Sequence, residues 1–565
     1  MRRVNTVSLI SGVLAFVGAG SMLASSCAPT NLGCDAYLTC DTNDSRGGAA
    51  GDTGLPGSAG AGGSNGGAEQ ESGGAAGAGA AGASTVGGNT DCDTQASPSA
   101  APCLVDERYG VFVAPEGDDE LGDGSRSAPF GSLQHALEVA VRVQRSRVFA
   151  CATAGAFEEA LAVDEALDGA ALYGGFSCDD WSRVEQRTRV ESPESWGARS
   201  EGLRRGFTAE DIEWVAADAA QSTAEGTAES SVALWVLESK GIVLRRVRLQ
   251  AGAGGDGAPG EAGQSGRDGA PAPDALSGQD ADCSEAAPTS QIGGEWPAEA
   301  VACGSSGGAG GQAFKSAVAD GNRGSDGVPR THVTPANEHN AGDGATEVAQ
   351  NAGSGRQGSN GDRGEPGAAA EELGIFTLEG YEPASGVPGT PGYAGQGGGG
   401  GGASKGDGSC LGASGGGGGM GGCGGNPGTG GGGGGASIAV LSWNSSIRIE
   451  SCELRAGDGG TGGEGGSAGP GGLGSAGAAG GLGDTVAGIG DGGQGGKGGH
   501  GGAGGPGSGG SGGPSLALVF KGERPDLRDT DLVLGRAGGA GLGGKAGAER
   551  APSGADAEAR EVLEL

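Results

Sequence analysis

Aromatic residues are scarce in this chain: only 4% of its 565 residues are Phe, Trp or Tyr, whereas 134 are Gly. This glycine content is about three times the average usage. The length would suit two to four domains, but too little apolar side chain is left for several ordinary cores. We therefore expect one packed core, formed by residues 104–250, 436–456 and 514–536.

Basic residues are also few, since 35 Lys and Arg stand against 70 Asp and Glu, for a net charge of −35. Nucleic acid is excluded as a partner because phosphate binding needs a basic surface. Electrostatic docking on anionic lipid is disfavoured for the same reason. We interpret the acidity as a source of solubility through self-repulsion, with calcium binding as the alternative.

The N-terminal apolar stretch, residues 7–17, is too short to span a bilayer. It follows Arg2 and Arg3, as in an export signal. The segment Leu23-Ala-Ser-Ser-Cys27 resembles a bacterial lipobox. That resemblance implies that Cys27 is lipidated, becomes the mature N-terminus and anchors the protein to a membrane.

Two positions refine the lipobox interpretation. Ala24 stands where Leu is usual, so ordinary signal-peptidase cleavage nearby is the alternative. Residue 29 is Pro rather than the Asp that retains many lipoproteins in the inner membrane. By resemblance, we expect an exported bacterial protein at the outer membrane or cell surface.

Cysteine usage agrees with export, because disulfides form in oxidising compartments. Of the twelve Cys, eleven remain after Cys27. Pairing neighbours in sequence gives the candidate disulfides Cys34–Cys40, Cys92–Cys103, Cys151–Cys178, Cys283–Cys303 and Cys410–Cys423. Spacing alone leaves other connectivities open. Cys452 is left over and is predicted to be a buried apolar residue, and no Cys pair has zinc-ligand spacing.

One apolar spacing recurs three times: Ile242-x-Leu-x-x-Val-x-Leu249, Ile447-x-Ile-x-x-Cys-x-Leu454 and Leu527-x-Asp-x-x-Leu-x-Leu534. This alignment places Cys452 level with Val247 and Leu532. Each copy follows a shorter apolar run that begins with Ser, at positions 231, 437 and 515. Two alternating runs that recur as a unit predict one coil of a stacked β architecture.

Glycine triplets fill the long segments between these units. Gly recurs at every third residue from 492 to 513, and the same period appears in 457–474, 254–269 and 361–369. Period three is that of a polyproline-II-type helix. Three alternatives stay open: a collagen-like triple helix, a random coil, and a bundle of antiparallel legs hydrogen-bonded along their glycine faces. The strict register favours the bundle.

The region before the first repeat suggests an end cap. Residues 109–113 alternate like a strand, and Leu133, Leu137, Ala140 and Val141 share one face of a helix that Ser132 could cap. The run Gly110-Val-Phe-Val-Ala-Pro115, followed by Gly122-Asp-Gly124 and Ala128-Pro-Phe130, resembles the opening cap of pectin-lyase-like proteins. The run Leu172-Tyr-Gly-Gly-Phe176, followed by Cys178 and Trp181, resembles a coil of such proteins.

This resemblance implies an all-β fold: a single-stranded right-handed parallel β-helix with an N-terminal capping helix. Gly-rich polyproline-II-type or disordered inserts would interrupt it. Similar architectures recur in large Gly-rich bacterial lipoproteins with PGRS-like repeats. In the physics of stacked coils, each layer satisfies its neighbours' backbone, and loops of any length can leave at the corners.

We divide the chain into eight segments. They are a signal peptide (1–27), a Cys-containing, Gly/Ala/Ser-rich tether (28–103), the β-helix cap and first coils (104–251), a Gly-rich insert (252–436), a coil (437–456), a Gly-triplet insert (457–514), a coil (515–536) and a Gly-rich acidic tail (537–565). Residues 212–214 mark one further layer within the first coils.

The sequence contains no convincing catalytic constellation. Asp179-Asp180 lies in a turn and is predicted to be a solvated corner rather than a catalytic pair. The Gly499-His500-Gly501 motif lies among the glycine triplets. Arg245, Arg246 and Arg248 are predicted to form a wet outer face of one coil. The calcium-repeat pattern is approached at residues 480–484, but its Asp falls one place early.

We therefore assign no catalytic, cofactor-binding or metal-binding residue, and no cofactor. The sequence favours a non-enzymatic surface lipoprotein that acts as a scaffold for adhesion or display, with polysaccharide or cell-surface ligands as partners. The alternatives are a carbohydrate-active β-helix enzyme, either a polysaccharide lyase or a hydrolase, and a calcium- or ice-binding repeat protein.

Overall fold

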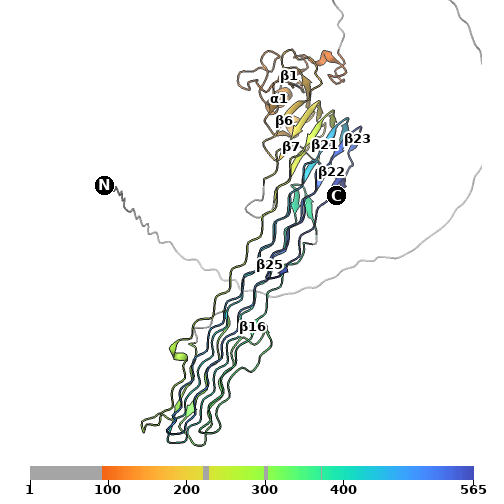
Figure 1. Cartoon of the computed structure of the whole chain (residues 1–565). Helices are drawn as coiled ribbons and strands as arrows, with labels where there is room; N and C mark the ends of the chain where they lie inside the picture. Colours follow the sequence, from red (N-terminus) through yellow and green to blue (C-terminus); the bar gives the residue numbers. More distant parts are fainter. Residues whose placement is uncertain (1–91, 221–227, 298–302, 371) are drawn as a thin grey trace, which may run out of the picture. The chain divides into compact units, whose positions relative to one another are not determined.

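The computed structural model describes residues 92–220, 228–297, 303–370 and 372–565, all within the compact unit Gly88–Leu565. This unit is rich in strands, and its three large sheets are parallel (Figure 1). We call them sheets A, B and C. Cys27, Cys34 and Cys40, with the signal peptide and most of the tether, lie outside the described residues.

Sheet A contains seven strands. In spatial order they are β1 (Gly110–Val113), β2 (Arg147–Cys151), β5 (Ala171–Phe176), β8 (Thr208–Glu210), β11 (Ile242–Arg245), β20 (Ile447–Glu450) and β23 (Asp526–Arg528). Sheet B contains six strands. They are β3 (Ala156–Phe157), β6 (Thr188–Glu191), β9 (Ile212–Val215), β12 (Arg248–Gln250), β21 (Glu453–Arg455) and β24 (Asp531–Val533).

Sheet C contains six strands. They are β4 (Leu161–Val163), β7 (Trp196–Glu201), β10 (Ser231–Leu237), β19 (Ser437–Trp443), β22 (Ser515–Lys521) and β27 (Ala559–Glu564). Each repeat unit therefore gives one strand to sheet C, then one to A and one to B. The prediction that the three distant repeats stack on one another is confirmed, because β11, β20 and β23 pair in order, as do β12, β21 and β24.

The predicted core lies between the three sheets. Ile242, Leu244 and Leu249 are all 0–1% exposed, because alternate residues of each strand point inward. The same apolar cluster continues through residues 439–454 and 517–520. Helix α1 (Leu133–Arg142) packs on this cluster beside β1 and β2, and the Ser132 hydroxyl accepts a hydrogen bond from the His135 N–H. The predicted helix and its cap are thus confirmed.

The third repeat is displaced by two residues from the alignment predicted from sequence. Leu527 pairs with Ile449, and Leu532 pairs with Leu454. Thr530, rather than Leu532, therefore follows Val247 and Cys452 in the stack. The sequence alignment matched leucines, but the hydroxyl of Thr530 fits this corner because it donates to the Ile449 carbonyl at 3.3 Å.

The corner between sheets A and B is a single left-handed residue in successive units. Asp211, Arg246, Ser451 and Asp529 have φ of 58°, 54°, 54° and 45°. None is Gly, although L-residues lose roughly 1–2 kcal/mol in this region. The repeated conformation turns the chain from sheet A to sheet B within one or two residues. The outward side chains of successive layers therefore occupy equivalent positions.

Both ends of the ordered unit extend beyond the predicted limits. At the start, the Cys92–Cys103 loop is ordered, and Ser97 Oγ donates to the Glu210 carboxylate at 2.6 Å. At the end, residues 537–565 are not a tail. They form one more hydrogen-bonded leg and then β27, which pairs with β22. Low apolar content hid both segments from sequence analysis.

Smaller elements decorate the sheets and the inserts. The short helices are η1 (Pro102–Leu104), η2 (Glu165–Leu167) and η3 (Asp274–Leu276). Four antiparallel pairs are β13 (Ser290–Gln291) with β14 (Ala313–Phe314), β15 (Val333–Thr334) with β16 (Asn360–Gly361), β17 (Gly374–Thr377) with β18 (Gly380–Pro383), and β25 (Lys545–Ala546) with β26 (Glu549–Arg550). Tyr381 of β18 packs on the outer face of sheet C.

The Ser that opens each repeat closes the coil with its hydroxyl. Ser437 Oγ donates to the Gly252 carbonyl at 2.6 Å and accepts from the Gly457 N–H at 2.7 Å. Ser231 and Ser515 make the equivalent contacts. All three residues are fully buried. Each hydroxyl therefore joins the exit of its own layer to the exit of the layer before.

Ser437→Ala is expected to destabilise the protein by about 1–3 kcal/mol, because it leaves the half-buried Gly252 carbonyl and Gly457 N–H without their partner. Ser442 of the same strand is the matched control: it is equally buried, but its hydroxyl has no partner among the described residues. Ser442→Ala should leave stability unchanged or raise it. Thermal and denaturant unfolding would measure both, and equal losses in the two variants would contradict the assigned role.

Candidate functional site

The glycine-rich inserts are ordered legs that lie side by side (Figure 1). We call the legs within residues 252–436, 457–514 and 535–558 the glycine arm. N–H groups of Gly254, Gly257 and Gly260 donate to carbonyls of residues 458, 461 and 464 at 2.7–2.8 Å. These bonds recur every third residue, as the triplet period requires. The predicted hydrogen-bonded bundle is confirmed, but its legs are not all antiparallel as predicted; the coil and the collagen-like helix are wrong.

Neighbouring legs run both parallel and antiparallel. The leg beginning at Gly460 runs antiparallel to residues 435–414, since Gly460, Gly463 and Gly466 donate to carbonyls of residues 435, 432 and 429. The same leg runs parallel to residues 254–269. Each leg thus uses several faces, so the arm is a two-dimensionally packed bundle rather than a single sheet.

The number of glycines per triplet reports how many neighbours a leg has. In the peripheral run 254–269, mainly one Gly per triplet is shielded, while residues such as Glu261 are exposed. The run 460–472 has two Gly per triplet except at Ala468, and its third positions, Thr461, Glu464, Ser467 and Pro470, are exposed. Residues 411–423, eight of which are Gly and most of the others small, are buried throughout. Sequence analysis found the period but missed this count.

Glycine is required in the arm by close backbone approach. A Cβ at Gly463 would lie 1.9 Å from the Ala258 carbonyl oxygen, and one at Gly501 would lie 1.9 Å from the Cys423 carbonyl oxygen. Both contacts are with backbone, which cannot move aside. The hydrogen bonds between legs can therefore form at these positions only because glycine has no side chain.

The arm continues the register of the sheets. Arg245 pairs with Glu450 across a separation of 205 residues, and Asp256 and Asp268 bond Thr461 and Leu473 at the same separation. Each Asp carboxylate accepts the backbone N–H of its partner residue at 2.6–2.7 Å. Strands and legs are thus stacked as one continuous layer system.

Disulfides fasten the outer part of the arm. The predicted pairs Cys92–Cys103 and Cys151–Cys178 are confirmed. Cys283–Cys303 and Cys410–Cys423 are wrong, because the structure pairs Cys283 with Cys410 and Cys303 with Cys423. Neighbours in sequence lie on different legs, whereas legs far apart in sequence lie in contact. Each bridge closes a loop of at least 120 residues.

Cys452 is free and buried, as predicted. Burial raises the pKa of its thiol. Its Sγ also accepts the Val247 N–H at 3.3 Å, in the layer beneath.

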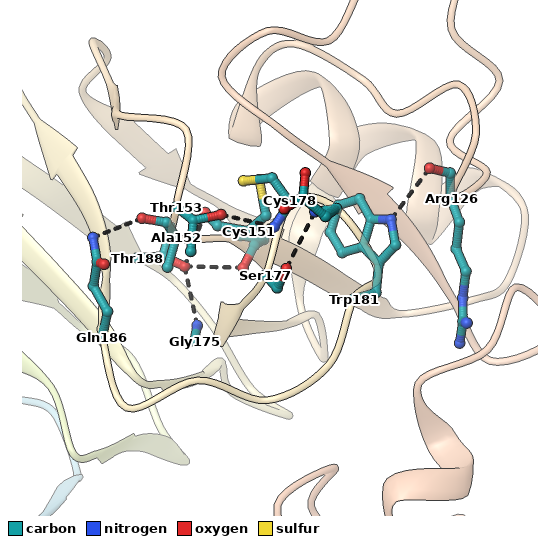
Figure 2. The surroundings of a disulfide bond; sticks show 12 residues. Arg126, Cys151, Ala152, Thr153, Gly175, Ser177, Cys178, Trp181, Gln186 and Thr188 are labelled. Atoms are coloured by element: carbon teal, nitrogen blue, oxygen red, sulfur yellow. Dashed lines mark hydrogen bonds between the residues drawn. A yellow bond between two sulfur atoms is a disulfide. The ribbon is translucent and has the colours of Figure 1, made fainter.

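The Asp179-Asp180 pair lies in an exposed turn, as predicted. The Cys151–Cys178 disulfide beside it ties β2 to the loop after β5 (Figure 2). Thr188 Oγ1 donates to the Ala150 carbonyl at 2.9 Å, and Trp181 Nε1 donates to the Arg126 carbonyl at 3.2 Å. These contacts hold the turn against the first coils, so this corner is a structural clasp.

The remaining motifs fall within the glycine arm. His500 Nδ1 accepts the Gly474 N–H at 3.3 Å, so Gly499-His500-Gly501 belongs to the leg lattice, as predicted. Asp484 Oδ1 accepts the N–H groups of Val486 and Ala487 within its own turn. Across the described residues, no group of three or more His, Cys, Asp or Glu could hold a metal ion. No helix found there is long and apolar enough to cross a membrane.

The predicted wet face of arginines is instead an ion-pair ladder across three layers. Arg245 contacts Glu210 and Glu450, each at 2.9 Å. Arg248 lies between Glu213 and Glu453, at 3.4 and 2.8 Å. The three arginine side chains retain only 34–37% of their exposure, and Glu210 retains none. Register places opposite charges in each stacked row, which the sequence of one coil could not reveal.

Arg246 adds a lateral clamp. Its Nε contacts Asp211 at 2.8 Å, and Arg183 contacts the same carboxylate at 2.6 Å. Burial alone would raise the pKa of Asp211, but hydrogen bonds from Arg246 and Arg183 outweigh it and hold the pKa below its ordinary value.

Comparison of the chain with protein families, with curated proteins and with solved structures found no match. The proposed function therefore rests on the chemistry of the arm and of the sheets.

Gly463→Ala is expected to lower the free energy of unfolding by about 1–3 kcal/mol or more, because the new methyl group would overlap the Ala258 carbonyl. Gly539→Ala is the matched control, since its Cβ would meet only Asp556 Oδ1, at 3.8 Å. That variant should be neutral or gain about 0.4–1 kcal/mol from lost unfolded-state entropy. Melting and amide hydrogen exchange of the arm would test the pair, and tolerance of both changes would refute close packing.

Arg246→Gln should make the protein less acid-resistant. The pKa of Asp211 is lowered by folding, so its stabilisation is present above the unfolded pKa, about 3.9, and is lost as pH falls through the folded value. Without Arg246 that folded pKa rises toward the unfolded value, so Asp211 contributes less stability at neutral pH and the protein reaches its acid unfolding midpoint at a higher pH. Acid unfolding followed by circular dichroism would show it, with exposed Arg536→Gln as control. Identical acid midpoints would contradict the clamp.

Proposed function

We propose that this protein is an exported bacterial surface lipoprotein that works as a non-enzymatic scaffold for display or adhesion. In this proposal Cys27 carries the lipid and anchors the protein to the membrane. The three parallel sheets would form a single-stranded right-handed parallel β-helix, capped by α1. The strand order of the repeats supports this, since successive units feed sheets C, A and B in the same sequence.

One observation carries the proposal: in the arm, the constrained positions face inward and the free positions face outward. Gly463, Gly466 and Gly469 are buried, while the alternating positions between them, such as Glu464 and Ser467, are exposed. Outward side chains can therefore change without disturbing the backbone bonds. A rigid backbone with replaceable surface residues is the physical property that a display structure needs.

The exposed chemistry suits a weak, extended partner. The chain has a net charge of −35, and the exposed arm positions are mostly small, polar or acidic. Such a surface offers hydrogen bonds along its length and little apolar area, which fits polysaccharide or a hydrated cell surface better than a compact protein partner. Asp179 and Asp180 lie in an exposed turn, so we assign this pair no catalytic step.

Cys27→Ser should move the protein from the membrane fraction to the soluble exported fraction, because the lipid attachment point is lost. Ser26→Ala is the matched control: it alters the adjacent position but keeps the cysteine, so the protein should stay with membranes. Antibody against the arm should label intact cells that carry the Ser26→Ala protein.

Three results would count against the proposal. Membrane fractionation unchanged by Cys27→Ser would refute the lipid anchor, and an arm reached only after lysis would refute surface display. Release of reducing or unsaturated ends from a polysaccharide panel would show an enzyme instead.

A further inference from the structure

A cavity of about 490 Å³ lies on the outer face of sheet A. Tyr173 of β5 and Thr208 of β8 lie in its lining, together with residues 94–97 of the Cys92–Cys103 loop. Three arginines, Arg147, Arg205 and Arg245, complete it. We call this space the arginine pocket. It is distinct from the glycine arm, and nothing in the display role uses it.

The charge of the arginine pocket is opposite to that of the protein. Three arginines and no Asp or Glu line it, whereas the whole chain has twice as many acidic as basic residues. Glu210 and Glu450 balance Arg245, and Asp168 lies 3.5 Å from Arg205, so Arg147 is the lining cation that has no carboxylate partner among the described residues. The pocket therefore offers a local concentration of guanidinium donors, which the general composition does not explain.

The carboxylates that belong to these arginines lie behind the lining and hold it in place. Glu210 is fully buried and contacts Arg245 at 2.9 Å, and Ser97 donates to the same carboxylate. Asp168 Oδ1 accepts the N–H groups of residues 204, 205 and 206 at 2.8–3.1 Å. The Asp168 backbone carbonyl also accepts from Arg205 Nη2. The pocket arginines are therefore positioned by a second layer of hydrogen bonds.

Arg147 is the least satisfied of the three. Its Nη2 donates to the Thr94 carbonyl, but its buried Nε has no hydrogen-bond partner among the described residues. A buried donor without an acceptor loses the free energy of a hydrogen bond. This buried Nε is itself out of reach of a ligand, so the contacts that Arg147 can offer the pocket come from the outer part of its guanidinium.

Hydroxyl groups accompany the arginines. Burial raises the pKa of Tyr173, and the neighbouring Glu210 charge raises it further, so the phenol stays protonated and can donate. Thr208 offers a second hydroxyl from the next strand. Arginine forks with hydroxyl donors match the planar or tetrahedral oxygens of an oxyanion. The volume also exceeds that of a bare ion and lies within the range of small-molecule sites.

We propose that the arginine pocket binds the oxyanion group of a small acidic molecule, with Arg147, Arg205 and Arg245 as the charged contacts. Carboxylate, sulfate and phosphate groups share this chemistry. The proposal does not depend on the display function, since either can fail alone.

The test is calorimetric titration of the full chain with sodium acetate, inorganic sulfate and inorganic phosphate at constant ionic strength. At least one anion should bind saturably and raise the melting temperature with concentration. A preference for acetate would identify a carboxylate ligand, and a preference for sulfate or phosphate would identify an ester of those acids. No saturable binding by any of the three would overturn the proposal.

Variants locate the site. Arg147→Gln and Arg205→Gln should each weaken binding roughly tenfold or more, because each removes a charge-assisted contact. The Arg205 side chain is 75% exposed, so its replacement should not impair folding even if that of Arg147 does. Exposed Arg145→Gln makes the same charge change outside the pocket and should bind like the parent. Equal affinity in Arg205→Gln and Arg145→Gln would overturn the assignment.

Discussion

Close approach between backbones is the constraint on which this molecule depends. In the glycine arm the legs meet where Gly N–H groups reach carbonyls of the next leg, and a methyl group at Gly463 or Gly501 would overlap those carbonyls. Buried backbone polar groups must be paired, and here they pair with other legs rather than within helices or sheets. Hydrogen bonding thus takes over the organising role that apolar side chains have elsewhere, which explains how so large a body folds with so few aromatics.

The apolar core and the arm divide the work of stabilisation. Ile242, Leu244 and Leu249 bury their side chains between the sheets. Beyond residue 251 the stack continues with only small apolar clusters, such as that of Leu276, Trp296 and Met420, yet it keeps the same 205-residue offset. The hydroxyl of Ser437 lies at the junction, where it bonds Gly252 and Gly457. The sheets therefore set the register in which the legs can pair. The hydrogen bonds between legs then offset the conformational entropy that is lost when the long inserts become ordered.

Much of the fold followed from the sequence because two periods are written plainly in it. Alternation in 242–249 and 447–454 predicted the stacked strands, and glycine at every third residue predicted the leg bundle. Local signals also sufficed for Ser132 and for the buried Cys452. Relations between distant segments were less accessible. Cys283 pairs with Cys410 because their legs are neighbours in space, and spacing along the chain holds no record of that.

The candidate sites were harder to anticipate than the fold. Arg245 looks like a solvated residue within its own coil, and only the register with Glu210 and Glu450 shows it to be part of a ladder. The same holds for the pocket on sheet A, whose arginines come from residues 147, 205 and 245. The sequence alignment of the third repeat was wrong because it matched Leu527 to Ile447, whereas the structure pairs Leu527 with Ile449. The contacts of an outward-facing side chain depend on which layers lie next to each other, and the sequence does not show this directly.

The parallel pairing of β10 with β19 has a kinetic consequence. Ser231 lies beside Ser437, so two adjacent strands of one sheet are synthesised with an entire insert between them. Folding rates fall as contacting residues become more distant along the chain. Assembly of the sheets must therefore await compaction of the intervening glycine segment. Until then, the edge of β10 stays open to wrong partners.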